Sequence, residues 1–505
     1  MSEVGDLLIA FDIGTTALKV GLFSTGGDLL CLETREQPLE KHSSGKVEQP
    51  ALGTWGLMKD AVNKIMQGYS SKDVVAISIS VQRGTVVPLD GEGKPLTNQI
   101  VWMDNRGIPY TEVLRNVIGE EEYYCTAGHG INHITGISKL LWMQGEAEGT
   151  WHEARVVSSP QTLFLKWLGC EEFVCDLSAG AYLFPFDIEE KTWDEDLAAQ
   201  IGYPIEKLPK LVTAVEVVGK LSKRAAKELG LRPGISLVAG GGDGQCAAAG
   251  SDVLESGLCM VNIGTAAGVQ VHLSEVKRDQ NLVLNCSGHV DPEAWEMEGH
   301  TQASGSVLRW FRDEFGGVEK AFGGMIKKDA YDLLVDQAKP VPPGSDGLLF
   351  LPTFMGSTAP QPNADAKGVL AGLTLGHTRD YVIRSLLEGV SLEIRWMLDA
   401  IVNTGVAVDE IRLVGGGSKN EFWNQIHADV FGRPIRTIEV NDAALVGASM
   451  CAAVAMGYYR NLQDAAQHFV RIKETIYPIE KNVSRYQDVY ENYRDLFMTL
   501  HYHYF

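Results

Sequence analysis

The sequence predicts an α/β protein made of two domains that face each other across a cleft. The chain has 505 residues, which is longer than proteins with a single hydrophobic core usually are. Short apolar runs that are typical of buried strands alternate with longer segments of helical periodicity. One glycine–threonine hairpin also occurs twice, half a chain apart. We expect the domain boundary near residues 245–257, which gives domains of residues 1–250 and 251–505.

The first hairpin is predicted from "LLIAFDIGTTALKVGLFSTGGDLL". Asp12 interrupts its apolar run, although a lone aspartate is rarely buried without a partner. Gly14, Thr15 and Thr16 then place small side chains and free backbone amides at the tip, and Lys19 follows. Since concave sets of N–H groups bind anions, we expect a phosphate site here. Asp12 is expected to serve a magnesium ion, directly or through water.

The second copy of the hairpin reads "LCMVNIGTAAGVQVHLS". Asn262 stands 250 residues after Asp12, and Gly264 and Thr265 repeat the glycine and threonine of the first tip. Only the first copy has a carboxylate, so we expect a metal role for Asp12 and none for Asn262. Two such tips facing each other would hold a polyphosphate between the domains. The alternative is a chance repeat of a common turn.

Further strands are predicted at "DVVAISISVQ", "ISLVAGGGDG" and "EIRLVGGGSKN", with helices at residues 380–402 and 420–432. The stretch "AALVGASMCAAVAMG" is expected to be a buried, tightly packed helix. Asp243 follows three glycines at the end of one strand, which is where α/β folds place ligands and catalytic groups. A general base for a hydroxyl suits this position. The alternative is an aspartate that caps the next helix.

Two more segments are candidates for ligand binding. In "LVGGGSKNEFWNQIHADVFGRPI", the backbone at Gly416 and Gly417 carries no side chains, so an adenine or a ribose could lie against it. A plain tight turn is the alternative there. The second segment, "SVQRGTVVPLDGEGKPLTNQIVWMDNR", suits a small polyhydroxylated ligand, although a solvated hairpin is a rival interpretation. Its polar and aromatic residues are Gln82, Arg83, Trp102, Asp104 and Arg106.

The charge balance limits the partners. The net charge is −21, with 65 acidic and 44 basic residues. Nucleic acid and anionic membranes are therefore not expected to bind the bulk surface. A phosphate compound has to be held locally, by backbone N–H groups and a divalent cation. No Walker A pattern, G-x-x-x-x-G-K-[ST], occurs, which argues against a P-loop enzyme.

The remaining features favour a cytoplasmic protein. The eight cysteines show no common zinc spacing and are expected to be small buried side chains in a reducing compartment. We find no signal peptide and no apolar run of membrane-spanning length. The oligomeric state stays open, a homodimer being one option.

Together, these motifs resemble the FGGY family of carbohydrate kinases, which includes xylulokinase and glycerol kinase, in the family's order and over nearly the whole chain. The resemblance implies two ribonuclease-H-like domains with an interdomain cleft, the fold of actin, hexokinase and the Hsp70 ATPase domain. It also implies ATP and Mg²⁺ as cofactors and a small sugar or polyol as the substrate.

The resemblance also implies individual roles. "FDIGTT" and "NIGTAAG" resemble the phosphate motifs, and "GGGSKN", ending at Asn420, resembles the adenosine motif. "SGSVLRWFRD" resembles the helix at the nucleotide and implicates Gly305 and Arg309. Asp243 takes the place of the catalytic base, and Asp12 and Asp243 are the carboxylates expected near magnesium. The family signature matches at Gly368, Gly372 and Glu388 and departs at Tyr381.

The substrate motifs match less well. Where xylulokinases usually have Gln-Met-His-Gly, this chain has "QRGT", so that Arg83 and Gly84 replace the methionine and the histidine. Glycerol kinases usually have Gln-Arg-Glu there. Ser357 and Thr358 also replace a usual Glu-Arg. We expect substrate contacts from Gln82, Arg83, Trp102, Asp104 and Asp243.

We therefore expect an ATP- and magnesium-dependent kinase that acts on a ketopentose, as xylulokinases do. Glycerol, erythritol or another polyol or sugar acid is the alternative substrate. Two rivals belong to other classes: an Hsp70- or actin-like regulatory ATPase, and a catalytically inactive sugar-binding regulator.

Overall fold

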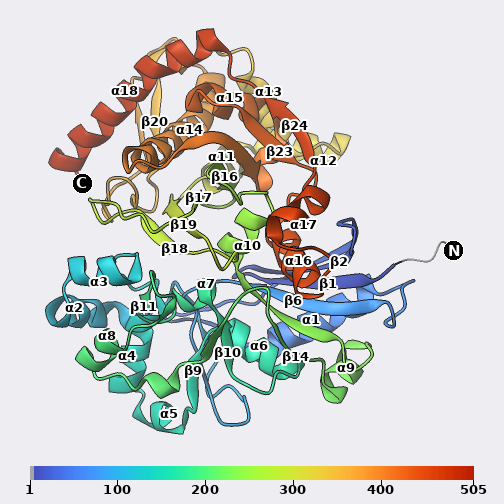
Figure 1. Ribbon diagram of the computed structural model, residues 1–505. Helices are drawn as coiled ribbons and strands as arrows, with labels where there is room; N and C mark the ends of the chain where they lie inside the picture. The colour runs from blue at the N-terminus through green and yellow to red at the C-terminus, as the bar shows by residue number, and fades with distance from the viewer. Residues whose placement is uncertain (1–4) are drawn as a thin grey trace.

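Two large β-sheets organise the computed structural model, which describes residues 5–505 (Figure 1). The first sheet has six strands, in the order β14 (Val217–Lys220), β15 (Ser236–Gly242), β6 (Val74–Val81), β1 (Leu7–Ile13), β2 (Ala17–Ser24) and β3 (Leu29–Glu36). The second has seven, in the order β18 (Asn285–Gly288), β19 (Trp295–His300), β17 (Ala267–Leu273), β16 (Gly257–Ile263), β22 (Val408–Val414), β23 (Ile435–Ile438) and β24 (Ile472–Ile476).

The two predicted hairpins occupy equivalent places in these sheets. β1 pairs antiparallel with β2, so that Asp12 lies opposite Lys19, and β1 also pairs parallel with β6. β16 pairs antiparallel with β17, so that Asn262 lies opposite Gly268, and β16 also pairs parallel with β22. The repeat noticed in the sequence is therefore confirmed as a repeat of structure.

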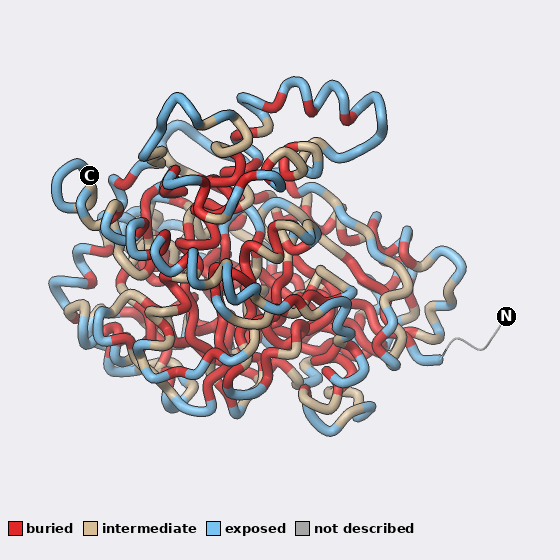
Figure 2. The backbone as a smooth tube through the Cα atoms, turned by 90° about the horizontal axis from the view of Figure 1, so that it is seen from above, coloured by how far each residue is buried: buried red, intermediate tan, exposed pale blue. Residues whose placement is uncertain are grey.

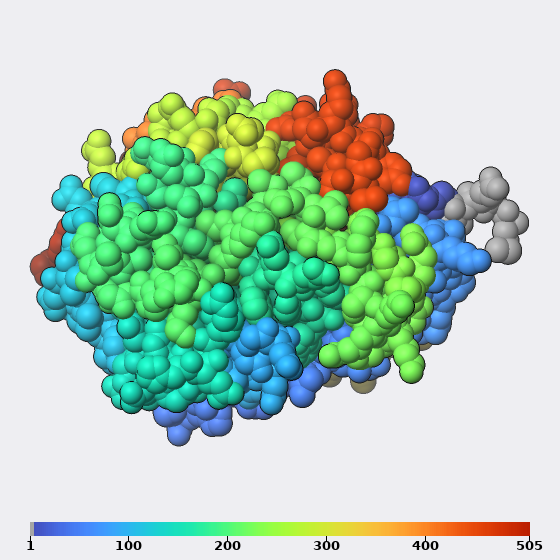
Figure 3. All heavy atoms as spheres, turned by 60° about the horizontal axis from the view of Figure 1, so that its bottom comes forward, coloured from blue at the N-terminus to red at the C-terminus, as the bar shows by residue number. Residues whose placement is uncertain are grey.

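Helices of both halves cover the first sheet. One face is packed by α1 (Ala51–Ile65), α6 (Pro160–Leu168) and α9 (Lys223–Leu229). Towards the other half of the molecule lie α10 (Asp243–Ala249), α16 (Ala443–Ala455) and α17 (Leu462–Phe469). Figure 3 shows the orange-red α16–α17 segment seated against the blue and green surface of the first half.

The apolar helix predicted from "AALVGASMCAAVAMG" is confirmed as α16, and it packs closely enough for backbone contact. A Cβ built on Gly447 would lie 1.8 Å from the Cys246 carbonyl oxygen, and one on Gly250 would lie 1.9 Å from the Ala443 carbonyl oxygen. α16 thus crosses α10 at a point where only glycine fits. This helix of the second half is part of the core of the first sheet.

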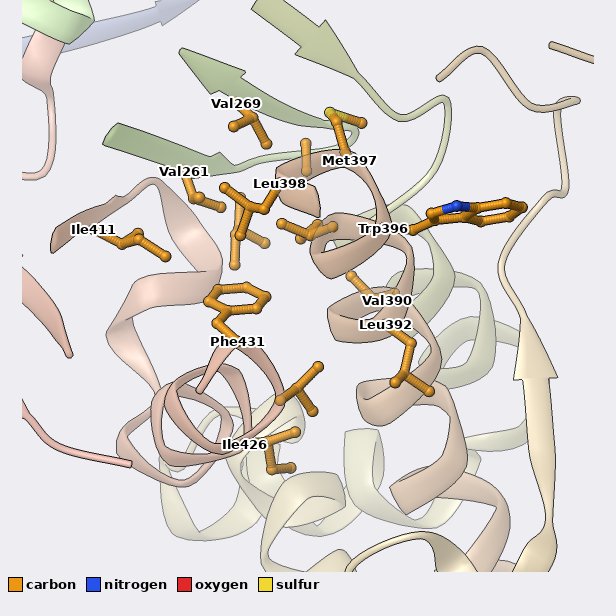
Figure 4. Close-up of a cluster of buried hydrophobic side chains, with 14 of the residues drawn as sticks. Val261, Val269, Val390, Leu392, Trp396, Met397, Leu398, Ile411, Ile426 and Phe431 are labelled. Atoms are coloured by element: carbon orange, nitrogen blue, oxygen red, sulfur yellow. The ribbon is translucent and has the colours of Figure 1, made fainter. Parts of the chain in front are cut away.

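The second sheet has its own core. Val261 and Val269 project from β16 and β17 towards Met397 and Leu398 of α14 (Arg379–Asn403), and Phe431 of α15 (Glu421–Phe431) closes the cluster (Figure 4). The buried chain is concentrated in the middle of the molecule, with exposed segments at its rim (Figure 2). The helices predicted at 380–402 and 420–432 are confirmed. The other helices of this half are α11 (Gly305–Phe315), α12 (Gly317–Ile326), α13 (Ala330–Ala338) and α18 (Glu480–His503).

Smaller elements surround the first sheet. Val86 and Ile100 exchange two backbone hydrogen bonds, which closes the hairpin predicted around residues 80–106. Its two arms also pair outward, β7 (Val87–Leu89) with β9 (Val156–Ser158) and β8 (Gln99–Ile100) with β5 (Val47–Gln49). The helices of this region are α2 (Ile108–Val117), α3 (Glu120–Ala127), α4 (Gly136–Glu146), α5 (Glu148–Glu153), α7 (Leu177–Gly180) and α8 (Glu195–Gln200). Of the helices in residues 5–505, none is long and apolar enough to cross a membrane.

Candidate active site

A cavity of about 520 Å³ lies between the two hairpin tips and is lined by both halves of the chain. Of the residues predicted from the sequence, its wall includes Asp12, Gly14, Lys19, Arg83, Asp243 and Gly416. The others lie outside this wall: Thr15, Thr16, Gln82, Trp102, Asp104, Gly264, Thr265, Gly305, Arg309, Gly417 and Asn420. Polar residues of the wall that the sequence did not single out include Gln270, His300, Lys419, Asn441 and Asp442.

The first tip brings a lysine between two carboxylates. The Lys19 Nζ lies 2.9 Å from Asp442 Oδ1 and 3.9 Å from Asp12 Oδ2. Burial raises the pKa of Asp12 to about 6, with Lys19 opposing the shift and Asp243 adding to it. Burial would lower the pKa of Lys19, but Asp12 and Asp442 together raise it. The ammonium group of Lys19 therefore stays charged in the cavity wall beside the first tip.

Asp243 is the first residue of α10 and follows directly on β15. The N-cap of the helix is Gly242, which makes no side-chain cap, so the capping alternative for Asp243 is wrong. Asp243 Oδ1 accepts a hydrogen bond from the Gly244 N–H at 2.9 Å. Burial raises the pKa of the Asp243 carboxyl, although Arg83 opposes the shift. A partly desolvated carboxylate in a cavity has the character of a general base.

Thr15 connects the first tip to two residues that we expected at the substrate. Its hydroxyl donates to Gln82 Oε1 at 2.6 Å and accepts from the Trp102 indole N–H at 2.9 Å. Gln82 in turn donates to Gln49 Oε1 at 3.0 Å. This chain of hydrogen bonds lies behind the tip and fixes its position. Thr16, next along the chain, is exposed.

The second tip is held by the start of α11. The Gly305 N–H donates to the Gly264 carbonyl oxygen at 2.9 Å, and the Thr265 carbonyl oxygen accepts from the N–H groups of Ser304 and Ser306. A Cβ built on Gly305 would lie 2.5 Å from the Gly264 oxygen, so the absence of a side chain permits this contact. Arg309 lies one turn further along α11 and is exposed.

The glycine-rich turn after β22 closes the cavity on the side of the second sheet. Gly415 has a φ of +85°, and a Cβ on it would lie 2.4 Å from Asn262 Oδ1. Gly416 is exposed to the cavity, whereas a Cβ on Gly417 would meet Ile263 at 2.4 Å. Asn420 caps α15, because its side chain accepts the Trp423 N–H at 3.1 Å. Of Gly416, Gly417 and Asn420, only Gly416 therefore forms part of the wall, together with Gly415 and Lys419 of the same motif.

Arg83 joins the two halves of the chain. Its Nη1 donates to Glu298 Oε1 at 3.0 Å and its Nη2 donates to Glu298 Oε2 at 2.5 Å, while the guanidinium lies 3.9 Å from the centre of the Tyr182 ring. Burial alone would raise the pKa of Glu298, but Arg83 holds it well below its usual range. Glu298 stands on β19 of the second sheet, and no local sequence signal marked it.

The structure does not bring Asp104 into the cavity, in contrast to our expectation. Its carboxylate accepts hydrogen bonds from the backbone N–H groups of Val47 and Arg106, at 2.7 and 2.9 Å, and from the Arg106 guanidinium at 2.9 Å. The side chain is fully buried and caps the 3₁₀ turn Asn105–Gly107. A carboxylate with this many internal donors has a structural role.

Comparison with known protein families agrees with this arrangement. The family model for the N-terminal domain of the FGGY carbohydrate kinases matches residues 7–250, and the model for the C-terminal domain matches residues 259–456. The chain is an FGGY carbohydrate kinase. It is therefore a phosphotransferase with an alcohol group as acceptor, and kinases of this family use ATP as the phosphate donor.

Relatives of this FGGY kinase carry different substrate names. It is 26% identical to the xylulose kinase of Bacillus subtilis over 97% of this chain and 96% of that protein. It is 28% identical to the gluconokinase of the same organism over 95% of this chain and 93% of the relative. The gluconate kinase structure from Lactobacillus acidophilus has the same fold, with a TM-score of 0.91, 24% identity and 99% of each chain covered.

Proposed function

We propose that the cavity between the two tips is the site of an ATP- and magnesium-dependent kinase whose acceptor is a small sugar or polyol, with a ketopentose as the first candidate. One observation carries the proposal: Asp243 shares a single cavity with the tip residues Gly14 and Lys19. A general base, an anion-binding tip and a cation are the parts that phosphoryl transfer needs.

The two tips and Lys19 would bind the phosphate groups of ATP, and Gly416 would face the nucleoside. A hydroxyl oxygen of the acceptor then forms a bond to the γ-phosphorus while the bond from that phosphorus to the β,γ-bridging oxygen breaks, which releases ADP. The proton of the attacking hydroxyl passes to Asp243. Because water is a competing acceptor, closure of the two halves around the ligands would favour transfer to the sugar over hydrolysis.

Asp12 and Asp243 are the side chains that would hold magnesium. Both line the cavity, and the charge of Asp243 contributes to the raised pKa of Asp12, so a cation between them would be favoured. Magnesium in nucleotide sites takes one or two carboxylates together with phosphate oxygens and waters. When bound, the ion would neutralise the charge that develops on the transferred phosphoryl group.

A screen of acceptors tests the proposal. ADP release is measured with D-xylulose, L-xylulose, ribulose, glycerol, erythritol and gluconate, and the phosphorylated product is identified by mass spectrometry. We expect at least one compound to raise ADP release about tenfold or more, with one phosphorylated product per ADP. If no acceptor changes ADP release, the rival regulatory ATPase is the better explanation. If ATP is not consumed at all, the inactive sugar-binding regulator is the better explanation.

A further inference from the structure

One end of the cavity is distinct from the phosphate tips, and we call it the acceptor end. It is formed by Arg83, Asp243, Gly244, Gln270 and His300. A Cβ on Gly244 would lie 3.1 Å from the Gln270 Nε2 and 3.7 Å from the Arg83 Nη2. A Cβ on Gly268 would lie 3.3 Å from the His300 Nδ1 and 3.4 Å from the Gln270 Nε2. These side chains are therefore close neighbours.

The guanidinium of the acceptor end, that of Arg83, is already paired with a carboxylate. Arg83 uses one N–H of each terminal nitrogen on Glu298, which leaves three of its five N–H groups for other acceptors. His300 faces the same carboxylate, with 3.4 Å between its Nε2 and Glu298 Oε2. The positive charge of the guanidinium is thus neutralised by Glu298 inside the protein. Three of its N–H groups nevertheless stay available as hydrogen-bond donors.

The wall behind this pair is rich in acceptor atoms. Glu296, on the same strand as Glu298, accepts a short hydrogen bond from Gln245, and burial raises its pKa well above the usual range. Among residues 5–505, three buried oxygens near this pair have no hydrogen-bond partner, Glu296 Oε2, Gln245 Oε1 and Gln270 Oε1, and of these three residues Gln270 lines the cavity. Since buried polar atoms are ordinarily satisfied, the unpartnered Gln270 Oε1 indicates a place for an O–H donor.

The other cations of the cavity lie elsewhere. Lys19 is paired with Asp12 and Asp442 at the first tip. Lys419 ends the turn Gly416–Lys419, on the side of the second sheet. A carboxylate group on the acceptor would therefore find no unpaired arginine or lysine among the residues of the acceptor end, and it would lie beside Asp243. Such like-charge contacts disfavour binding.

We infer, on the basis of the proposed kinase activity, that the acceptor end selects an uncharged polyhydroxy compound, a ketose or an alditol, and rejects an aldonate. A hydroxyl can accept from the free N–H groups of Arg83 and donate to Gln270 Oε1. A carboxylate can only accept. The discrimination thus comes from the pairing of Arg83 with Glu298, whereas a free arginine would recognise an anion.

Matched acceptors test the inference. The kcat/KM of the wild-type enzyme is measured for glycerol and glycerate, xylitol and xylonate, glucitol and gluconate, with xylulose and ribulose as ketoses. We expect the best uncharged compound to exceed every aldonate by about 100-fold or more. Glu298→Gln keeps the shape of the side chain and removes its charge, so the ratio is expected to fall at least tenfold. The control is Glu393→Gln, a buried carboxyl outside the cavity wall, which is expected to leave the ratio unchanged.

The outcomes separate the two proposals. An aldonate as the best wild-type substrate overturns the inference and leaves the proposed kinase intact. An unchanged ratio in a folded Glu298→Gln enzyme also overturns it. If that variant does not fold, the wild-type comparison still decides. If neither the uncharged compounds nor the aldonates are phosphorylated in the presence of ATP and magnesium, both the proposed function and the inference are refuted.

Discussion

At the residue scale, Asp243 is the side chain on which the proposed chemistry depends. Asp243→Asn keeps the size of the side chain and the hydrogen bond to Gly244 but removes the base, so kcat is expected to fall by about 10²–10⁴-fold. The melting temperature and the affinity for ATP in the absence of magnesium should change little, because phosphate binding is assigned to the tips. Steady-state kinetics, a thermal melt and an ATP titration check this.

Asp409→Asn, an exposed aspartate outside the cavity, is the matched control and should keep full activity. A near-normal kcat for Asp243→Asn would remove Asp243 from the mechanism.

Glu393 shows how burial alone perturbs a carboxyl. It stands on α14, its Oε2 has no partner within residues 5–505, and burial raises its pKa to about 8. Because this pKa is raised above that of the unfolded chain, the stability linked to the protonated group is complete below about pH 4.5 and is lost as the pH rises towards 8. Glu393→Gln should abolish this loss, a gain on the order of 4 kcal/mol at pH 8.

Urea unfolding of the Glu393→Gln variant and of the parent between pH 5 and pH 8 measures the difference in their free energies of unfolding. We expect this difference to grow steadily with pH. A difference that is constant across this range would show that the carboxyl is not held in its neutral form.

At the element scale, the crossing of α10 and α16 joins the helix that begins with Asp243 to a helix from the far end of the chain. Gly447→Ala places a methyl group against the Cys246 carbonyl oxygen, so the helices have to separate. We expect a loss of about 1–3 kcal/mol, which is typical of overpacking. Gly56→Ala is the control, because Gly56 lies in α1 with no atom within 4 Å of the added carbon.

Alanine is the better helix former, so the control should gain about 0.5–1 kcal/mol. Chemical denaturation of both variants decides the matter. Equal effects of the two substitutions would mean that the crossing tolerates a side chain.

At the scale of the whole molecule, the Arg83–Glu298 pair connects the two sheets across the cavity. Both side chains are almost fully buried, so removing one partner leaves an uncompensated charge and should cost about 3–5 kcal/mol. The double variant Arg83→Met/Glu298→Met removes both charges and should lose clearly less than the sum of the single variants. A double-mutant cycle in urea measures the coupling.

The exposed pair Lys210–Glu172 is the control for this cycle, with an expected coupling below about 1 kcal/mol. Kinetics add a second readout: Arg83→Met should raise the KM for the acceptor and leave the KM for ATP nearly unchanged. Additive stabilities would show that the pair does not hold the halves together, and a defect confined to ATP would place Arg83 at the nucleotide.

The sequence by itself determined the features that are local. Strand and helix periodicity, glycine turns and the repeated hairpin depend on neighbouring residues, so β1–β2, β16–β17, α14 and α15 were predictable, as was the position of Asp243 after its strand.

Only the tertiary structure decided the features that depend on contacts between distant segments. Glu298 lies 215 residues from Arg83, Asp442 meets Lys19 from the other half, and α16 completes the core of the first sheet. Asp104 became a buried cap because its donors, Val47 among them, are supplied by the folded chain. Sheet pairing and helix packing bring such partners together through shape and burial. The spacing of residues in the sequence therefore does not predict them.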